Sequence, residues 1–267
     1  MNRTIVLLTL ILAASLAAAP ALAQESPWRL GIALGYGEKS NPLILSDDIP
    51  IVVDLDIAYF GKRFFFDNGD LGLTVADNEW LTGSLMARVN SDRVFFGKTN
   101  TDFISIGLDG ASLSAAVEVV VPDRDYAIEA GFEVLSDGSW GYLQLAAFHD
   151  VSGTHDGYEV DLSYGIGWRS QRWYFYPSIG VSYKSAAMND YYWGVRPGES
   201  SAVLPAYEAG AGINVLGRLT VSYFFSRNWA FTLAAQYERM NDEAAASPIV
   251  DDQNVLGWFG GLQFRFQ

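Results

Sequence analysis

Residues 213–240, INVLGRLTVSYFFSRNWAFTLAAQYERM, decide the fold. Apolar side chains recur at almost every second position over 213–225 and again over 229–237, and polar or small side chains fill the positions between them. A period of two is typical of a β-strand with two unlike faces. The polar pair at 227–228 separates the two runs, so the stretch predicts a hairpin. Each arm is longer than the usual strand of about five or six residues.

The same alternation recurs along most of the chain. Asn68-Gly69 is the strongest short hairpin signal, and two apolar pieces at 103–108 and 113–121 are either loop hairpins or extra strands. We expect about 12 strands, with 10 or 14 as alternatives, and no segment with a helical period after residue 23. The further predicted strands lie at 28–36, 49–59, 64–67, 71–75, 80–89, 126–134, 140–149, 158–168, 173–183 and 256–266.

The first residues predict export from the cytoplasm. Arg3 precedes an apolar run over 5–19, and Ala21-Leu22-Ala23 follows as a cleavage site, which is the arrangement of a secretory signal peptide. An uncleaved anchor is the alternative, but the run is shorter than the ~20 residues that a spanning helix needs. We therefore expect a signal peptide over 1–23 and one domain over 24–267.

Composition excludes several classes of function. The chain has no cysteine, which rules out a disulfide framework and thiolate sites. Its formal net charge of −14 leaves no electrostatic route to nucleic acid. Since no later apolar run has spanning length, a mature form in a membrane must be a closed β-barrel.

Alternation alone does not separate a membrane barrel from a soluble sandwich or barrel, which buries its apolar face. The connections favour the membrane, because short periplasmic turns and long external loops are typical of outer-membrane barrels. The predicted fold is therefore all-β, a transmembrane antiparallel up-and-down β-barrel of the bacterial outer membrane. The short connections are 61–62, 136–139, 169–172 and 227–228, and the long ones are 90–125, 187–211 and 241–253.

Two sets of side chains support the same interpretation. Aromatic rings with a polar edge gather near strand ends, where the membrane interfaces would lie; these are Trp28, Tyr36, Tyr158, Trp168, Trp173, Tyr183, Trp229, Tyr237 and Trp258. Charges occupy the opposite face, which a dry soluble core could not accommodate. The candidate lumen charges are Arg29, Glu129, Glu159, Asp161, Lys184, Arg218 and Arg265.

The amino-acid sequence of several segments resembles that of the MipA/OmpV family of Gram-negative outer-membrane proteins. Those segments are Trp28-Arg29-Leu30-Gly31, RFFFDNGDLGLTV (63–75), DVSGTHDG (150–157), DYYWGV (190–195), LPAYEAGAG (204–212), YERMNDE (237–243) and ASPIVDD (246–252). The resemblance implies a barrel in the outer membrane, in contact with its lipid and lipopolysaccharide. It also implies a scaffold that binds a lytic transglycosylase and a murein synthase, and it supplies no catalytic residues.

Candidate catalytic and metal chemistry is sparse. His149 and His155 flank one loop with Ser152, which permits a loop-based lipid hydrolase, although a hydrogen-bonded loop at the barrel rim is the favoured interpretation. Acidic loop residues could bind calcium or bridge to lipopolysaccharide, but they lack EF-hand spacing, and a solvated acidic surface is favoured. These acids are Asp47, Asp48, Asp190, Glu199, Asp242, Glu243, Asp251 and Asp252. We expect no cofactor and no catalytic site.

Two functional hypotheses follow from different sources. The resemblance favours a non-enzymatic scaffold for peptidoglycan-remodelling enzymes. The polar inner face favours a narrow pore or solute channel, with charges that either set ion selectivity or pair across the lumen and plug it. The resemblance also implies, as an alternative, a porin-like or osmotically responsive channel or an adhesin. Strand number does not decide, because barrels of about 12 strands lie between filled small barrels and open porins.

Overall fold

The computed structural model describes residues 27–96 and 121–266. The predicted signal peptide, the apolar piece at 103–108 and most of the piece at 113–121 lie outside the described residues. Within that part of the chain, no helix is long and apolar enough to span a membrane.

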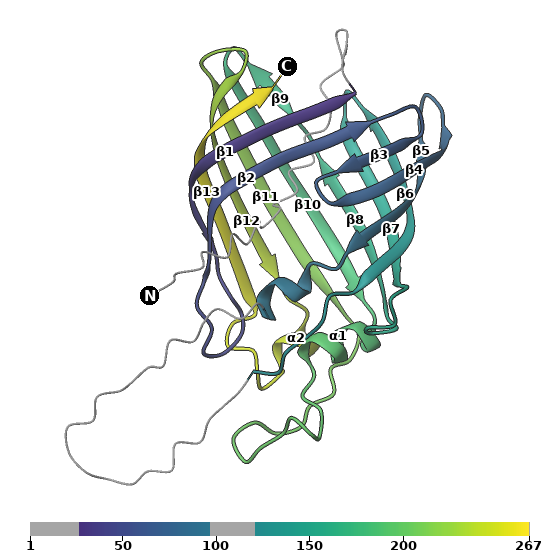
Figure 1. Ribbon diagram of the computed structural model, residues 1–267, viewed down its shortest axis with the longest axis vertical. Coiled ribbons are helices and arrows are strands. Elements are labelled where there is room, and N and C mark those ends of the chain that lie inside the picture. The colour runs from purple at the N-terminus through teal and green to yellow at the C-terminus, as the bar shows by residue number, and fades with distance from the viewer. Residues whose placement is uncertain (1–26, 97–120, 267) are drawn as a thin grey trace, which may run out of the picture.

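The predicted all-β fold is confirmed, because the strands form one closed antiparallel barrel (Figure 1). β8 and β9 pair with successive parts of β10 and act as one interrupted strand, so the wall has 12 strands. The ring closes where β10 pairs with β11. The strands are β1 (Trp28–Lys39), β2 (Ile49–Phe60), β3 (Phe64–Asp67), β4 (Asp70–Asp77), β5 (Thr82–Val89), β6 (Ile128–Gly138), β7 (Gly141–Asp150), β8 (Tyr158–Gly165), β9 (Trp168–Ser170), β10 (Trp173–Lys184), β11 (Gly212–Phe224), β12 (Trp229–Arg239) and β13 (Asn254–Phe266).

The apolar side chains of the alternating pattern face outward. Leu145, Leu162, Val181 and Val215 are direct cross-strand partners on four neighbouring strands, and each keeps more than 40% of its surface exposed. A soluble protein rarely exposes so continuous an apolar surface. Around a closed barrel it forms the lipid-facing band that outer-membrane proteins carry.

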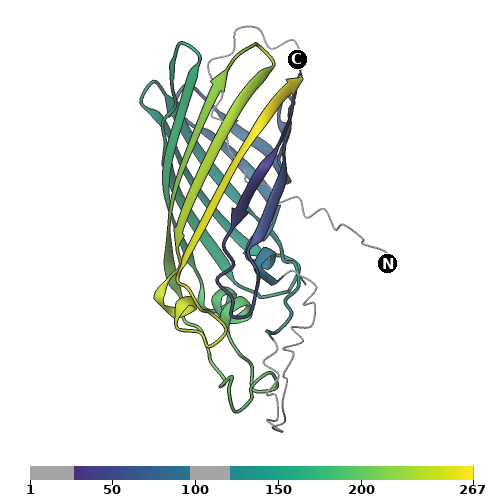
Figure 2. The same ribbon diagram turned by 90° about the vertical axis from the view of Figure 1, so that its left-hand side faces the viewer.

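Aromatic side chains border this band at both ends. Along β10, Trp173 and Tyr183 lie about ten residues apart, which at about 3.3 Å per residue and a tilt near 40° spans about 25 Å, the usual height of the apolar band. Rings pair across strands at each border, as in Trp28 with Tyr59 at 4.9 Å between ring centroids. Figure 2 shows the tilt of the strands.

The two ends of the barrel differ. The strands connect by brief turns at the end that holds the start of β1 and the end of β13, which we call the short-turn end. Within the described residues, the opposite, long-loop end carries three helices: η1 (Asp92–Phe96), α1 (Ala186–Trp193) and α2 (Asp242–Ala245). The sequence did not indicate them, because helices this short show no helical period. Each α-helix is capped instead, α1 by the Ser185 side chain and α2 by that of Asn241.

The wall is irregular next to β2. A register shift between Leu34 and Gly37 puts one extra residue into β1, and Ile51 of β2 is buried although the alternation assigned it to the lipid face. The β3–β4 hairpin turns back after four residues, at Asn68-Gly69. It therefore pairs with β2 only over Ala58–Phe60, and the rest of that edge of β2 has no strand partner among the described residues.

Candidate functional site

A compact plug fills the long-loop end. We use this name for η1, α1, α2 and the loops packed with them. Its core includes Phe95, Phe96, Met188, Tyr192 and Trp193, each no more than 5% exposed. The ring centroids of Phe96 and Trp193 lie 5.6 Å apart, which joins η1 to α1. Side chains from β1, β2 and β13 pack against the same cluster, so the barrel is closed at this end.

A buried ionic cluster lies on the wall beside the plug. Arg88 of β5 donates from Nε to Glu129 Oε2 at 2.8 Å and from Nη1 to Asp161 Oδ2 at 3.1 Å. It also donates to Glu159, and its guanidinium carbon lies 3.7 Å from the centroid of the Phe148 ring. One arginine therefore ties β5, β6, β7 and β8 together through the lumen.

A second basic residue links the wall to the plug. Lys184, at the end of β10, donates from Nζ to both carboxylate oxygens of Asp92 in η1, each at 2.6 Å. Both side chains are almost completely buried. His155 Nε2 lies 3.3 Å from Glu129 Oε1, and its Nδ1 accepts a hydrogen bond from the Gly157 amide at 2.9 Å. Ionic contacts therefore connect the plug to the wall, in addition to the apolar packing.

Outside the spanning strands, another arginine fastens the long loop after α1. The fully buried Arg124 side chain donates to Glu199 Oε1 at 2.8 Å and Oε2 at 3.0 Å, and to the Gly194 carbonyl at 2.8 Å. Partial burial of Glu199 opposes its ionisation, but these hydrogen bonds outweigh that effect and hold the pKa of the carboxyl below its ordinary value. Burial in the plug raises the pKa of Tyr192.

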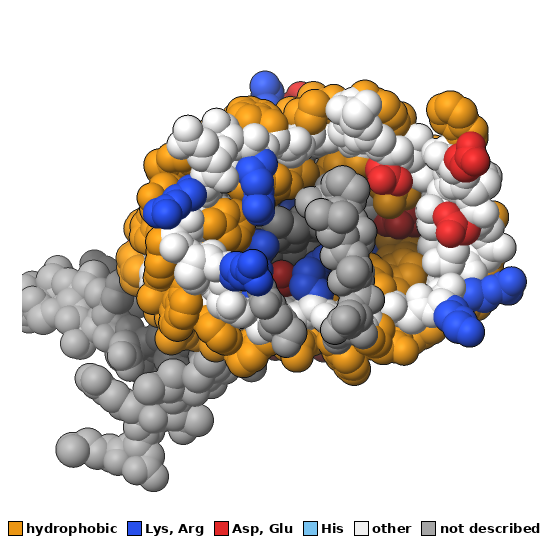
Figure 3. All heavy atoms as spheres, turned by 90° about the horizontal axis from the view of Figure 1, so that it is seen from above, with side chains coloured by type: hydrophobic (Ala, Val, Ile, Leu, Met, Phe, Trp, Pro, Cys, Tyr) orange, Lys and Arg blue, Asp and Glu red, His pale blue; other side chains and the backbone are white. Residues whose placement is uncertain are grey.

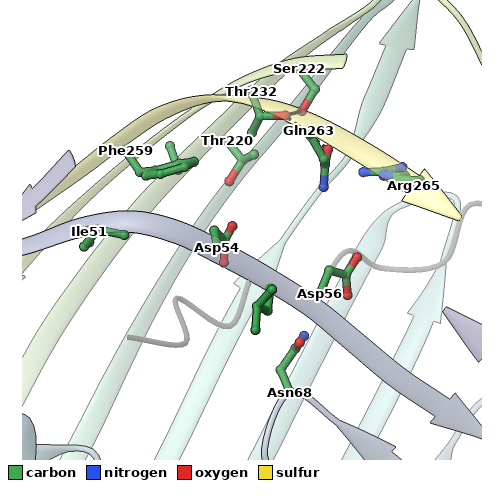
Figure 4. A pocket seen from close by; sticks show the side chains of 12 residues that line it. Ile51, Asp54, Asp56, Asn68, Thr220, Ser222, Thr232, Phe259, Gln263 and Arg265 are labelled. Atoms are coloured by element: carbon green, nitrogen blue, oxygen red, sulfur yellow. Dashed lines mark hydrogen bonds between the residues drawn. The ribbon is translucent and has the colours of Figure 1, made fainter. Parts of the chain in front are cut away.

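At the short-turn end the described residues fill the lumen only in part, with a buried cluster of Tyr142, Tyr174 and Tyr176. Seen from there, the molecule is hollowed, and basic side chains gather along one side of the hollow (Figure 3). A pocket of about 610 Å³, open solvent included, lies between β2, β11, β12 and β13. Asp54 and Asp56 face Gln263 and Arg265 across it, and hydroxyl groups of β11 and β12 line its floor (Figure 4). The arrangement provides donors and acceptors in a solvent-accessible cup.

The structure divides the candidate lumen charges into separate groups. Glu129, Glu159, Asp161 and Lys184 come together in the cluster beside the plug. Arg29 lies near the other end, where it binds Asp56 and Asp67 at 2.9 Å each. Arg218 donates to Gln236 at 2.9 Å, and Arg265 lines the pocket. Their roles in binding or selectivity stay predictions.

Sequence reasoning missed two central members of the ionic cluster. Arg88 belongs to a predicted strand with weak alternation, and Asp92 follows in the stretch that showed no pattern. Asp54 and Asp56 belong to the predicted strand over 49–59, but nothing in the sequence connected them with Arg29 or Arg265. The candidate interface aromatics lie on the outer surface, seven of them more than 40% exposed.

The geometry does not assemble a serine–histidine pair in the described residues. His149 is exposed on the outside of β7, and the Ser152 hydroxyl donates to Asp150 Oδ1 at 2.6 Å. Both nitrogens of His155 face other groups, as given above. No group of three acidic or histidine side chains converges as metal ligands in the described part of the chain.

Comparison with known proteins identifies the family. The sequence model of the protein family described as MltA-interacting protein MipA matches residues 30–266. The chain belongs to this family. It is 28% identical to outer membrane protein OmpV of Vibrio cholerae over 64% of this chain and 68% of that protein. It is 28% identical to MltA-interacting protein of Escherichia coli K12 over 54% of this chain and 58% of that one.

The alignment with a third relative covers more of this chain. Putative outer membrane protein YiaT of Escherichia coli O157:H7 is 25% identical over 91% of this chain and 87% of its own. Among solved structures, the loop L8 deletion mutant of OmpT from Vibrio cholerae matches at a TM-score of 0.35 and 10% identity, over 91% of this chain and all of that one. The barrel and the named relatives together identify an outer-membrane protein.

Proposed function

We propose that this MipA-family barrel is a non-enzymatic scaffold that presents its open end to a peptidoglycan-remodelling enzyme. The observation that carries the proposal is the asymmetry of the lumen, which the plug closes at the long-loop end and which the described residues fill only in part at the short-turn end. In outer-membrane barrels, short turns face the periplasm and long loops face outward. A cup that opens toward the periplasm suits binding on the side where peptidoglycan lies.

The partner class comes from the relatives. One of them is named MltA-interacting protein, and we extend that interaction to this chain as a lytic transglycosylase, with a murein synthase as a further partner. Arg172 and Arg227 are exposed on the turns around the opening, together with Lys62 and Arg63. Asp77, Glu79 and Asp137 are exposed at other turns of the same end, so the basic charge is confined to part of the rim. That part favours a partner with an acidic surface, because complementary charge speeds association. Removal of residues 1–23 and contact with lipid and lipopolysaccharide belong to the same proposal.

Partner capture tests the scaffold. The refolded barrel, immobilised in detergent, is incubated with a purified lytic transglycosylase of the MltA class. We expect retention, and we expect the double variant Arg172→Glu/Arg227→Glu to retain much less at low salt. The matched control is Arg239→Glu, an exposed arginine at the end of β12 near the long loops. No retention of the enzyme, or equal loss in both variants, would reject the proposal.

A narrow channel is the second candidate, and the polar inner face is the observation that favours it. Conduction would require the plug to move, since its core side chains are almost completely buried. Recording from the refolded protein in a planar bilayer separates the two functions. The absence of conductance through correctly folded protein supports the scaffold, whereas reproducible conductance steps with ion preference support the channel.

A further inference from the structure

Two arginines share one aromatic ring at the open end of the barrel. The guanidinium carbon of Arg169 in β9 lies 4.8 Å from the centroid of the Phe224 ring, and that of Arg265 in β13 lies 5.2 Å from it. Their separation is therefore at most about 10 Å, within reach of mutual repulsion. Attraction to the ring face offsets part of that repulsion for each cation.

Neither arginine has an anionic partner among the described ion pairs. Nε and Nη2 of Arg265 are buried and without a hydrogen-bond partner, which costs free energy in a folded protein. The pocket does contain carboxylates, but Asp56 Oδ1 already accepts from Arg29 at 2.9 Å. Asp54 lies on the opposite wall of the same pocket (Figure 4). Asp56 Oδ2 is buried without a hydrogen-bond partner, so the two carboxylates reduce the positive charge of this side of the pocket, but neither forms an ion pair with Arg169 or Arg265 among the described residues.

A third donor stands beside Arg265. Gln263 is two residues earlier on β13, so its side chain points into the same lumen. Its Oε1 accepts from the Thr232 hydroxyl at 3.2 Å, which directs its Nε2 into the pocket (Figure 4). The Thr232 oxygen in turn lies 3.0 Å from the Ser222 oxygen. This chain of hydrogen bonds fixes the orientation of the amide before any ligand arrives.

We propose that Arg265, Gln263 and Arg169 form a binding site for an oxyanion, a phosphate or carboxylate group, at the periplasmic opening of the lumen. Arginine is suited to this class because its planar fork of donors matches two oxygens of one phosphate or carboxylate. The pocket is open to solvent, so the ligand can enter without movement of the plug. The site requires no partner protein and is independent of the scaffold proposal.

Calorimetric titration of the refolded barrel in an uncharged detergent tests the site. Inorganic phosphate is the first probe, and dihexanoyl phosphatidylglycerol is the second, because it carries the same phosphate on a lipid. Saturation by either probe with one site per barrel supports the proposal, and the probe that binds more tightly identifies a soluble or a lipid-borne source. No saturable binding of either probe would overturn it.

Matched variants locate the binding. We expect Arg265→Gln and Arg169→Gln each to weaken binding by roughly tenfold, since each removes one charged hydrogen-bonding partner. Arg172→Gln is the control, because the Arg172 side chain is exposed on the neighbouring turn. Its hydrogen bond with Phe224 runs through the backbone, from the Phe224 amide to the Arg172 carbonyl at 2.8 Å, and is kept in the variant. Arg169 is itself exposed, so its variant is expected to fold even if that of Arg265 does not. An equal loss in the Arg172 control would show diffuse attraction instead and reject the site.

Discussion

Replacing Lys184 with methionine should loosen the plug from the wall. In the parent protein, Lys184 Nζ lies 2.6 Å from each carboxylate oxygen of Asp92. The substitution removes this cation and leaves the carboxylate buried. Removal of one member of a buried pair costs about 3–5 kcal/mol. Asp92→Asn should cost less, because Glu159 remains 4.0 Å from the ammonium group. We expect a loss of about 3 kcal/mol or more in the free energy of unfolding for Lys184→Met.

The double variant Lys184→Met/Asp92→Leu makes the reasoning testable. With both charges gone, the site becomes apolar, and replacement of a buried pair by apolar residues of similar volume is often neutral. We expect the double variant to lie within about 1 kcal/mol of the parent, so that the two substitutions are strongly non-additive. Urea unfolding in lipid vesicles, followed by tryptophan fluorescence, gives all four values.

A surface pair provides the control for this cycle. Arg239 lies 3.5 Å from Asp242, and both side chains are more than half exposed. Exposed pairs contribute little, so Arg239→Met should change stability by less than about 0.5 kcal/mol. A Lys184→Met variant as stable as this control would refute the role of the buried pair. A double variant as unstable as the sum of its single substitutions would refute it as well.

Three further substitutions probe other contacts. Gly131→Ala would place its Cβ 1.8 Å from the Ala147 carbonyl oxygen, so we expect a loss of about 3 kcal/mol in urea unfolding, whereas Gly217→Ala, with open space around it, should be nearly neutral. Asp150→Asn should cost about 2 kcal/mol in the same assay, because the carboxylate accepts from the His155 and Ser152 amides; exposed Asp156→Asn is its control. The pKa of Glu199 is lowered in the folded state, so its stabilisation is present above about pH 4.5 and is lost as pH falls through the folded value. Thermal unfolding at about pH 6 and pH 3 should show a smaller fall for Glu199→Gln than for the parent protein.

Most strands were predictable because they carry a period of two, and the lipid-facing band followed from that period together with the loop lengths, the aromatic residues near strand ends and the charges on the opposite face. The plug was not predictable, since Phe95, Phe96 and Trp193 lie in segments without a repeating pattern. Their burial depends on loops that meet only after the barrel closes. Burial of Ile51 depends on one extra residue in β1, which shifts the register and has no signal in the sequence.

Individual lumen charges followed from alternation, but their partners did not. Glu129 and Glu159 were assigned to the inner face, yet Arg88 joins them only because β5, β6 and β8 curve around one lumen. Likewise, Arg265 of β13 meets Arg169 of β9 at the Phe224 ring of β11, and these three strands are separate in the sequence. Sequence periodicity gives the direction of a side chain, whereas barrel closure decides which side chains meet.

The charges of the lumen differ in their partners. Beside the plug, every basic side chain of the ionic cluster is bound to carboxylates: Arg88 to three of them and Lys184 to Asp92. At the opening, Arg29 is bound to Asp56 and Asp67, whereas Arg169 and Arg265 lie near an aromatic ring and have no carboxylate in an ion pair among the described residues. Positive charge without a carboxylate partner attracts anions. The oxyanion site that we propose rests on this difference between Arg29 and the two arginines beside Phe224.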